Sequence, residues 1–234
     1  MSESGMIYDH VAAIRARLES LAPPGQVKLM AVTKFHSRSE AMAAVEAGVD
    51  LVGENRIQEA VEKWQGAAPG VPLHAIGHLQ TNKVKYAIGL FDAIDAVDSD
   101  RLAAALDRTA DKPVRIMVEV NVGGEASKFG LAPGAVFPFI QSLERYPRLV
   151  AAGLMTVLPE RRENSVEETR RIRGHMQEMV GLWRMCRSEG WPWAPLNDLS
   201  MGMSGDWEWA VEAGSTIIRL GTRIFGQRPK ALRD

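Results

Sequence analysis

The chain has 234 residues and a formal net charge of −1, from 28 lysines and arginines against 29 aspartates and glutamates. Hydrophobic residues make up 46% of it and charged residues 24%, which is typical of a folded globular protein rather than a disordered or fibrous chain. The balanced charge lacks the basic excess of a general nucleic-acid binder, and no apolar run reaches the roughly 20 residues that span a bilayer. The single cysteine, Cys186, excludes an intrachain disulfide and a zinc site built from clustered thiolates.

The first residues, Met1-Ser2-Glu3-Ser4, contain no basic segment followed by an apolar stretch, so no signal peptide is expected. A chain of this length can bury enough surface to form one autonomous core. We therefore expect a cytoplasmic protein that has neither nucleic-acid nor membrane partners.

Short apolar runs alternate with helical segments along the chain. An opening helix is predicted over 7–21, where apolar residues recur at spacings of three and four and Pro23 follows. Strands are predicted at 27–32, 51–52, 73–76, 93–97, 114–122, 149–155, 196–200 and 216–220. Helices are predicted between them at 38–47, 57–64, 101–109, 136–145, 166–186 and 207–213.

This alternation predicts the fold class. Strands separated by helices form parallel pairs joined by right-handed crossovers rather than hairpins. Eight such units within 234 residues predict an α/β protein built as a single (β/α)8 TIM barrel. We expect residues 1–234 to form one domain, with residues 1–25 as a leading helical segment. An open, doubly wound sheet is the alternative, and it would need fewer strands.

A lysine follows the first predicted strand, at the end of a barrel where functional groups are found. Lys34 closes the segment Ala31-Val32-Thr33-Lys34. Burial against apolar walls lowers the pKa of a lysine, and its neutral amine can then attack a carbonyl group. A surface lysine that precedes the next helix is the alternative interpretation of this position.

Two segments with glycine and hydroxyl residues run off predicted strands seven and eight, at 199–206 (LSMGMSGD) and 219–226 (RLGTRIFG). Such turns expose backbone N–H groups that can bind an anion, and barrels commonly bind phosphate at this place. A reactive lysine facing a phosphate site suggests a phosphorylated aldehyde held as a Schiff base. Pyridoxal 5′-phosphate fits this description, and so does a sugar phosphate processed by an aldolase, so these residues leave the ligand open.

Five segments in chain order resemble the pyridoxal phosphate homeostasis protein family, whose members are single-domain relatives of the alanine racemase barrel. They are 31–34 (AVTK), 52–59 (VGENRIQE), 74–83 (HAIGHLQTNK), 199–204 (LSMGMS) and 219–226 (RLGTRIFG). The resemblance covers nearly the whole chain and implies a fold-type III barrel that binds pyridoxal phosphate as a monomer and serves vitamin B6 homeostasis. One departure is His78, where many relatives carry proline.

The resemblance also implies a role for individual residues. Lys34 would form the Schiff base with the cofactor, and Arg219 would face the pyridine nitrogen. The phosphate would be held by Ser204, Gly221 and Thr222. Further residues expected in the cofactor pocket are Asn55, Ser200 and Met201. Pyridoxal phosphate-dependent apo-enzymes are the partners to which such a protein would deliver its cofactor.

The same residues argue against an enzyme. An arginine beside the pyridine nitrogen disfavours its protonation, so the cofactor withdraws electrons from a bound amino acid less strongly. Two-domain racemases take a second base, a tyrosine, from an additional domain. The tyrosines of this chain, Tyr8, Tyr86 and Tyr146, do not stand at predicted strand ends. We therefore expect a non-catalytic binding protein, with a pyridoxal phosphate-dependent racemase or lyase as the alternative.

Four other polar residues have weaker signals. His74 and His78 are spaced as i,i+4, but a strand does not place them as a metal pair, so no metal site is predicted. Glu119 and Asn121 are predicted to share one face of strand five, because side chains in a strand alternate with a period of two. They could contact a ligand, and ordinary hydrogen bonding inside the barrel is the alternative.

Overall fold

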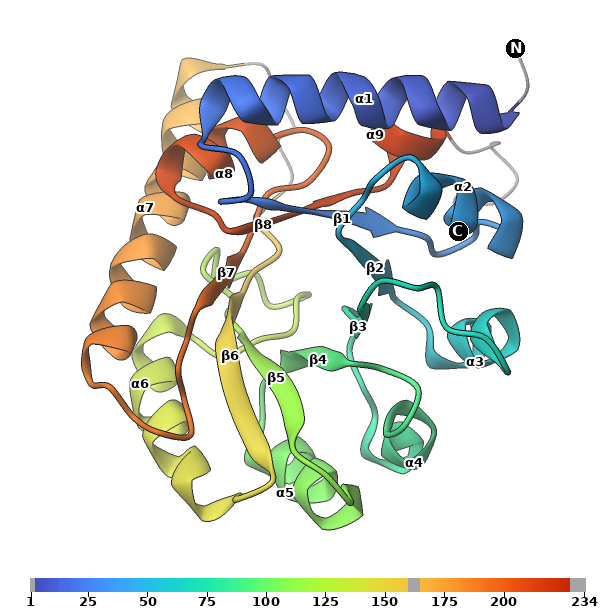
Figure 1. Cartoon of the computed structure of the whole chain (residues 1–234). Helices are drawn as coiled ribbons and strands as arrows, with labels where there is room; N and C mark the ends of the chain where they lie inside the picture. The colour runs from blue at the N-terminus through green and yellow to red at the C-terminus, as the bar shows by residue number, and fades with distance from the viewer. Residues whose placement is uncertain (1–2, 160–164, 228–234) are drawn as a thin grey trace.

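The computed structural model describes residues 3–159 and 165–227. Eight parallel strands close into a barrel in chain order, and β8 pairs with β1 (Figure 1). The strands are β1 (Lys28–Val32), β2 (Leu51–Glu54), β3 (Leu73–Ala75), β4 (Ala93–Val97), β5 (Val114–Glu119), β6 (Leu149–Met155), β7 (Asp198–Ser200) and β8 (Ile217–Leu220). The predicted (β/α)8 barrel is confirmed, and its closure excludes an open doubly wound sheet.

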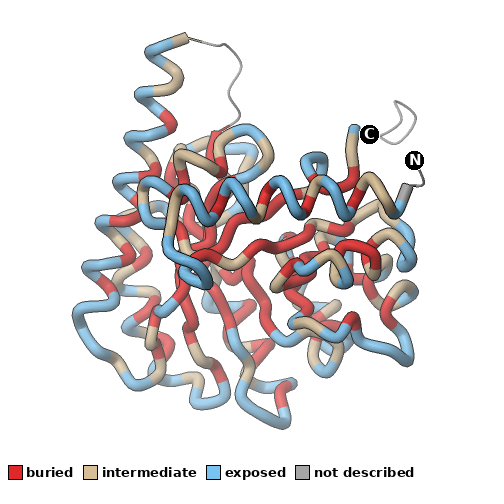
Figure 2. The backbone as a smooth tube through the Cα atoms, turned by 45° about the horizontal axis from the view of Figure 1, so that its top comes forward, coloured by how far each residue is buried: buried red, intermediate tan, exposed pale blue. Residues whose placement is uncertain are grey.

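Helices form the outer layer of the barrel. They are α1 (Glu3–Leu21), α2 (Arg38–Glu46), α3 (Ile57–Trp64), α4 (Val84–Ala87), α5 (Asp100–Thr109), α6 (Pro133–Ser142), α7 (Val166–Ser188), α8 (Trp207–Ala213) and α9 (Thr222–Phe225), with 3-10 turns η1 (Thr81–Lys83) and η2 (Leu143–Arg145). Buried positions follow the strands and the inner sides of the helices, and exposed positions follow their outer sides (Figure 2). No helix among the described residues has the length and apolar character needed to cross a membrane.

The leading helix α1 covers the barrel where its first and last strands meet. Its face formed by Ile7, Val11 and Leu18 is buried in one apolar cluster with outward-facing residues of β1 and β8. The same cluster contains Trp207 of α8 and Phe225 of α9. The apolar spacing that predicted this helix therefore marks the face that it packs against the barrel.

Element boundaries differ from the prediction where polar contacts end a strand. β5 stops at Glu119, and the next residue, Val120, forms an isolated bridge with Leu131 at the far end of the loop that follows. The Asn121 side-chain amide donates to the carbonyls of Glu125 and Lys128 within that loop. The prediction that Asn121 shares a strand face with Glu119 is therefore wrong.

Other boundaries shift for local reasons. Strand β7 begins at Asp198 rather than at 196, because Leu196 has a φ of 46°, which no extended strand accommodates. Strand β2 is longer than predicted and continues to Glu54. The short turns η1 and α4 were not predicted, since neither is long enough to show a helical repeat.

The barrel interior is apolar in the middle and charged towards the amino ends of the strands. Met30, Met117 and Ile217 belong to a buried interior cluster. At the amino ends, Asp198 accepts hydrogen bonds from Lys28 at 3.0 Å and Arg115 at 2.6 Å. Side chains therefore fill the barrel at the amino ends of its strands. Polar groups that could contact a ligand lie at the carboxyl ends of the strands.

The histidines have ordinary partners. His74 Nδ1 lies 2.9 Å from Asp95, and although burial lowers the pKa of His74, the Asp95 carboxylate raises it above the usual value. The His78 ring stacks on Phe129 at a centroid distance of 3.9 Å. Within the two described ranges, no three histidine, cysteine or acidic side chains gather as metal ligands. Cys186 is buried, and burial raises the pKa of its thiol to about 11, as expected for an unreactive packed cysteine.

Replacement of Ser37 by alanine is expected to lower the free energy of unfolding by about 1 kcal/mol. Ser37 caps α2: its hydroxyl accepts a hydrogen bond from the Glu40 N–H, and the Glu40 carboxylate accepts one from the Ser37 N–H. Urea unfolding followed by circular dichroism measures the change. Ser188→Ala, at the exposed last residue of α7, is the control. Equal losses in the two variants would contradict the capping role.

Candidate functional site

The turn between β1 and α2 carries Lys34 just beyond the carboxyl end of the first strand, as predicted. Thr33 is buried and Lys34 is half-buried. Phe35, the next residue, has a φ of 66°, in the left-handed region that residues other than glycine rarely occupy. The Arg56 guanidinium lies 4.7 Å from the centroid of the Phe35 ring and holds this side chain in place. The turn therefore fixes the direction in which the backbone leaves the lysine.

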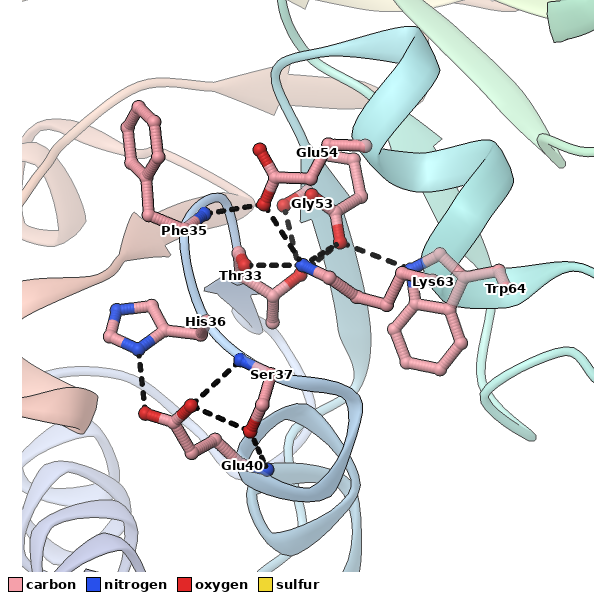
Figure 3. Close-up of polar contacts among 10 residues, drawn as sticks. Thr33, Phe35, His36, Ser37, Glu40, Gly53, Glu54, Lys63 and Trp64 are labelled. Atoms are coloured by element: carbon pink, nitrogen blue, oxygen red, sulfur yellow. Dashed lines mark hydrogen bonds and ion pairs between the residues drawn. The ribbon is translucent and has the colours of Figure 1, made fainter.

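The carboxylate of Glu54, the last residue of β2, supports this turn (Figure 3). Its Oε1 accepts hydrogen bonds from Thr33 Oγ1 at 2.7 Å, Lys63 Nζ at 2.9 Å and the Trp64 indole N–H at 3.0 Å. The Glu54 side chain is fully buried and that of Lys63 is 6% exposed, so the two form a buried ion pair. Because loss of either partner would leave an unpaired buried charge, the pair ties β1, β2 and α3 together.

The same network holds the peptide groups on both sides of Lys34. Lys63 Nζ donates to the carbonyl of Thr33 at 2.7 Å, and the Phe35 N–H donates to Glu59 Oε1 at 2.5 Å (Figure 3). Lys63 also lies 3.3 Å from Glu59, one turn away on α3. Sequence reasoning missed this network. The available signals were a glutamate that closes an apolar strand and a Glu–Lys pair at i,i+4 on the next helix.

Two turns at the same end of the barrel bring hydroxyl groups together. Ser204 follows β7 and Thr222 begins α9 after β8, and their hydroxyl oxygens lie 2.9 Å apart. Within the described part of the chain, no acceptor is bonded to the backbone N–H of Ser204, Gly221 or Thr222. Hydroxyl and unpaired amide groups are the donors that protein phosphate sites use. The two turns therefore contain the donors that the predicted phosphate site requires.

The lysine turn lies beside the α9 turn. A Cβ atom on Gly221 would come to 3.4 Å from the Val32 carbonyl oxygen, so the two backbones approach closely. The rings of His36 and Phe225 stack with centroids 4.1 Å apart, which joins the residues that follow Lys34 to the end of α9. The fold thus unites residues from the first and last strands of the barrel.

Arg219, in β8, lies beneath these turns inside the barrel. It is 4% exposed, and its guanidinium donates to Ser200 Oγ at 2.5 Å and to the Thr156 carbonyl at 2.6 Å. Burial lowers the pKa of Arg219, and nearby carboxylates, including Asp95 and Glu119, oppose this shift. Arg219 and Ser200 are thereby held as one hydrogen-bonded unit across β7 and β8.

Asn55 and Met201 differ in exposure: Asn55 borders open space, whereas the Met201 side chain is buried. Asn55 follows β2 and borders an open hollow of about 660 Å³. A Cβ atom on Gly77 would lie 2.2 Å from the Asn55 carbonyl oxygen, so glycine is required there for Asn55 to keep its position. Met201 is fully buried in the apolar cluster between barrel and helices. A ligand would therefore meet the backbone of Met201 rather than its side chain.

Glu119, at the carboxyl end of β5, is a buried acid in the same part of the barrel. It is 8% exposed, and its Oε2 is fully buried and has no hydrogen-bond partner among the described residues. Burial raises the pKa of Glu119 to about 7; the negative charge of Asp98 adds to the rise, and Arg219 opposes it. Glu119 therefore titrates close to neutral pH.

Residues 8–229 match the family model of the alanine racemase N-terminal domain. The pyridoxal phosphate homeostasis protein of Vibrio cholerae is 33% identical to this chain over 235 residues, which cover 95% of this chain and 96% of that protein. The protein of the same name from Escherichia coli K12 is 31% identical over 95% of this chain and 97% of its own length. This chain belongs to the pyridoxal phosphate homeostasis protein family.

Solved structures agree with membership of the pyridoxal phosphate homeostasis protein family. An unknown protein from Bifidobacterium adolescentis is 32% identical and has a TM-score of 0.88, with 95% of each chain covered. PipY of Synechococcus elongatus, solved with pyridoxal phosphate bound, is 31% identical and has a TM-score of 0.79, over 94% of this chain and all of PipY. An alanine racemase from Clostridium difficile, 16% identical with a TM-score of 0.74 over 95% of this chain and 58% of that chain, shares the fold alone.

Proposed function

We propose that this chain is a pyridoxal 5′-phosphate-binding protein that holds the cofactor as a Schiff base on Lys34 and serves intracellular cofactor homeostasis and delivery to apo-enzymes. One observation carries the proposal: the lysine turn after β1 lies beside the α9 turn, whose Thr222 hydroxyl is 2.9 Å from Ser204. The proposed attachment point and the proposed phosphate donors thus lie at one end of the barrel. Membership of the family, and PipY solved with this cofactor, support the same ligand.

Lys34 would supply the amine to which the cofactor is attached. Pyridoxal phosphate supplies a reactive aldehyde. The neutral Lys34 amine attacks the aldehyde carbon, a C=N bond forms, and the carbonyl oxygen leaves as water. Because this condensation is reversible, another amine can take the cofactor over. Attachment therefore protects a reactive aldehyde and still permits its release to an apo-enzyme.

The phosphate donors would give this site its selectivity for the phosphorylated cofactor. Ser204, Gly221 and Thr222 supply hydroxyl and backbone N–H groups with no other acceptor for their amides. A hydrogen bond to a charged group contributes about 1.5–3 kcal/mol. Two or three such bonds, discounted for non-additivity, separate pyridoxal phosphate from pyridoxal by roughly a hundredfold or more.

The remaining residues favour binding over catalysis. Arg219 is buried and bonded to Ser200. As the family resemblance implies, it would face the pyridine nitrogen, and its positive charge would disfavour protonation of that nitrogen. The tyrosines stand elsewhere: Tyr8 on α1 bonds to Glu46, Tyr86 lies on α4, and Tyr146 bonds to Asp100. A tyrosine base of the kind that racemases use has no counterpart at this site.

The absorption spectrum of the purified protein tests the proposal. We expect a near-visible band that borohydride abolishes, with the pyridoxyl label on the peptide that contains Lys34. Incubation with alanine in deuterated water tests the alternative of a racemase or lyase: exchange at the α-carbon at about 1 s⁻¹ or faster would establish an enzyme. A colourless protein that acquires no label with pyridoxal phosphate would contradict the proposal. Light scattering of the same sample tests the expected monomer.

Replacement of Thr222 by valine is expected to weaken retention of pyridoxal phosphate about tenfold, because one hydroxyl donor to the phosphate is lost. The dissociation constant, measured by equilibrium dialysis, checks this value. Thr109→Val, at the end of α5, is the control. Binding of pyridoxal without its phosphate should not change in Thr222→Val. Equal dissociation constants for the two variants would exclude Thr222 from the phosphate site.

A further inference from the structure

Glu119 is a buried acid that has no role in the proposed binding of pyridoxal phosphate. Side chains of β5 alternate with a period of two, and Met117 belongs to the cluster inside the barrel. Glu119, two residues further along, therefore points inwards, one layer closer to the carboxyl end. Arg219 stands in the corresponding layer of β8, two residues beyond Ile217 of the same cluster. Glu119 and Arg219 thus form part of one polar layer beneath the turns that hold the candidate ligand.

The surroundings of Glu119 leave one oxygen unsatisfied. Its Oε2 is buried without a hydrogen-bond partner among the described residues, whereas buried carboxyl oxygens in folded proteins are normally paired. On the neighbouring strand β6, Met155 pairs with Glu119, and neither Met155 nor Thr156, which follows β6, carries a charge. A ligand that entered the carboxyl end of the barrel would supply the missing partner.

The charged groups around Glu119 come from three elements. Asp98, which follows β4, adds a negative charge and accepts a hydrogen bond from a backbone N–H of the β5–α6 loop. Arg219 of β8 adds a positive charge, and Asp95 of β4 acts on that arginine. In the β5–α6 loop itself, Lys128 forms an ion pair with Glu125 at 2.5 Å. Glu119 therefore shares its surroundings with the Asp98 carboxylate, which raises its pKa, and with the Arg219 guanidinium, which opposes that rise.

We propose that Glu119 contacts the bound cofactor from the β5 side of the barrel as a neutral carboxylic acid, and that loss of its proton loosens the cofactor. This inference rests on the proposed binding of pyridoxal phosphate. In its neutral form Glu119 can donate an O–H to an oxygen of the ligand, because a protonated carboxyl is a donor as well as an acceptor. In its ionised form it has no proton to donate, and it adds a negative charge beside an anionic ligand.

Retention of the cofactor should then depend on pH through Glu119. The pKa of about 7 places the change within the physiological range. Below this value the neutral acid holds the ligand, and above it the carboxylate repels the ligand. We expect the affinity of the site to fall across neutrality, so that a rise in cytoplasmic pH favours release.

The variant Glu119→Gln tests this inference, because glutamine keeps the shape and a donor but cannot ionise. We compare dissociation constants for pyridoxal phosphate between pH 6 and 8.5 at constant ionic strength. The ratio of the wild-type constant to that of Glu119→Gln should rise roughly three- to tenfold, with a midpoint near pH 7. Titration of Lys34 and of the phosphate acts on both proteins and cancels in the ratio. A ratio that is constant with pH would overturn the inference.

Two further variants sharpen the test. Asp98→Asn removes the neighbouring charge that raises the pKa of Glu119, so the midpoint should move to lower pH. Glu144→Gln, at an exposed position of η2, is the control and should follow the wild type. If Glu119→Gln fails to fold, the ratio of the wild-type dissociation constant to that of Asp98→Asn still decides: it should change with pH around neutrality, and a ratio that is constant with pH would count against Glu119.

The ligand-free protein provides a second readout. The carbonyl absorption of a protonated carboxyl in difference infrared spectra should disappear with the same midpoint in the wild type and be absent from Glu119→Gln.

Failure of the inference and failure of the proposed function are distinguishable. A borohydride-fixed label on Lys34 together with a flat ratio would refute only the role of Glu119. Absence of any label in the wild type would refute the proposed function itself.

Discussion

Replacement of Lys34 by alanine is expected to abolish the borohydride-fixed pyridoxyl label and the near-visible band, because Lys34 is the proposed attachment point and its turn lies beside the proposed phosphate site. The half-buried side chain lies in a turn, so its removal leaves no large cavity. The free energy of unfolding should therefore change by no more than about 0.5 kcal/mol. Reduction with borohydride followed by mass spectrometry of the digested protein measures the label.

The control for this variant is Lys112→Ala, at an exposed position between α5 and β5. It should keep both the band and the label. Weaker, non-covalent binding of pyridoxal phosphate should persist in Lys34→Ala, since the donors of Ser204 and Thr222 remain. A stoichiometric label on a different lysine would show that Lys34 is not the attachment point.

Replacement of Lys63 by methionine is expected to lower the free energy of unfolding by about 3–5 kcal/mol, because it leaves the Glu54 carboxylate buried without its cation. The Thr33 carbonyl also loses its donor. Denaturant unfolding measures the change. At temperatures where the variant stays folded, attachment of pyridoxal phosphate should also be slower, since the peptide before Lys34 is no longer held.

A double variant separates charge from packing in this network. Glu54→Gln combined with Lys63→Met removes both charges, while the glutamine oxygen can still accept from Thr33 and the Trp64 indole. Most of the lost stability should return in the double variant. A free energy of unfolding of the single Lys63→Met variant within about 1 kcal/mol of the wild-type value would contradict a stabilising role of this ion pair.

The fold could be predicted to the extent that its elements are long and apolar. The predicted bounds of β4 and β6 agree with the structure because each is apolar, apart from Asp95 in β4, and is buried along nearly all of its length. The prediction extended strand five too far, since the alternation of side chains continues through Asn121. What ends the strand is the side-chain amide of that residue bonding to loop carbonyls, a contact that local sequence does not reveal.

The candidate site could be predicted in part. The position of Lys34 after β1 and the two turns after β7 and β8 were evident from residue types at strand ends. The buried pair of Glu54 and Lys63 was not, because it joins residues of two different elements, the end of β2 and the helix α3. The side chain of Met201 also turns into the apolar cluster, a direction that the strand boundary alone did not determine.

The pairing of β8 with β1 has a consequence for the order in which the site is completed during translation. Strands emerge in the order in which they stand around the barrel, so β8 is added last and closes the ring against β1. Lys34 is synthesised early, but Arg219 and Thr222 arrive only with this final strand and the turn after it. A nascent chain accordingly lacks the proposed phosphate donors of the α9 turn until its last strand and that turn have been translated. If the site works as proposed, full retention of the cofactor would require the closed ring.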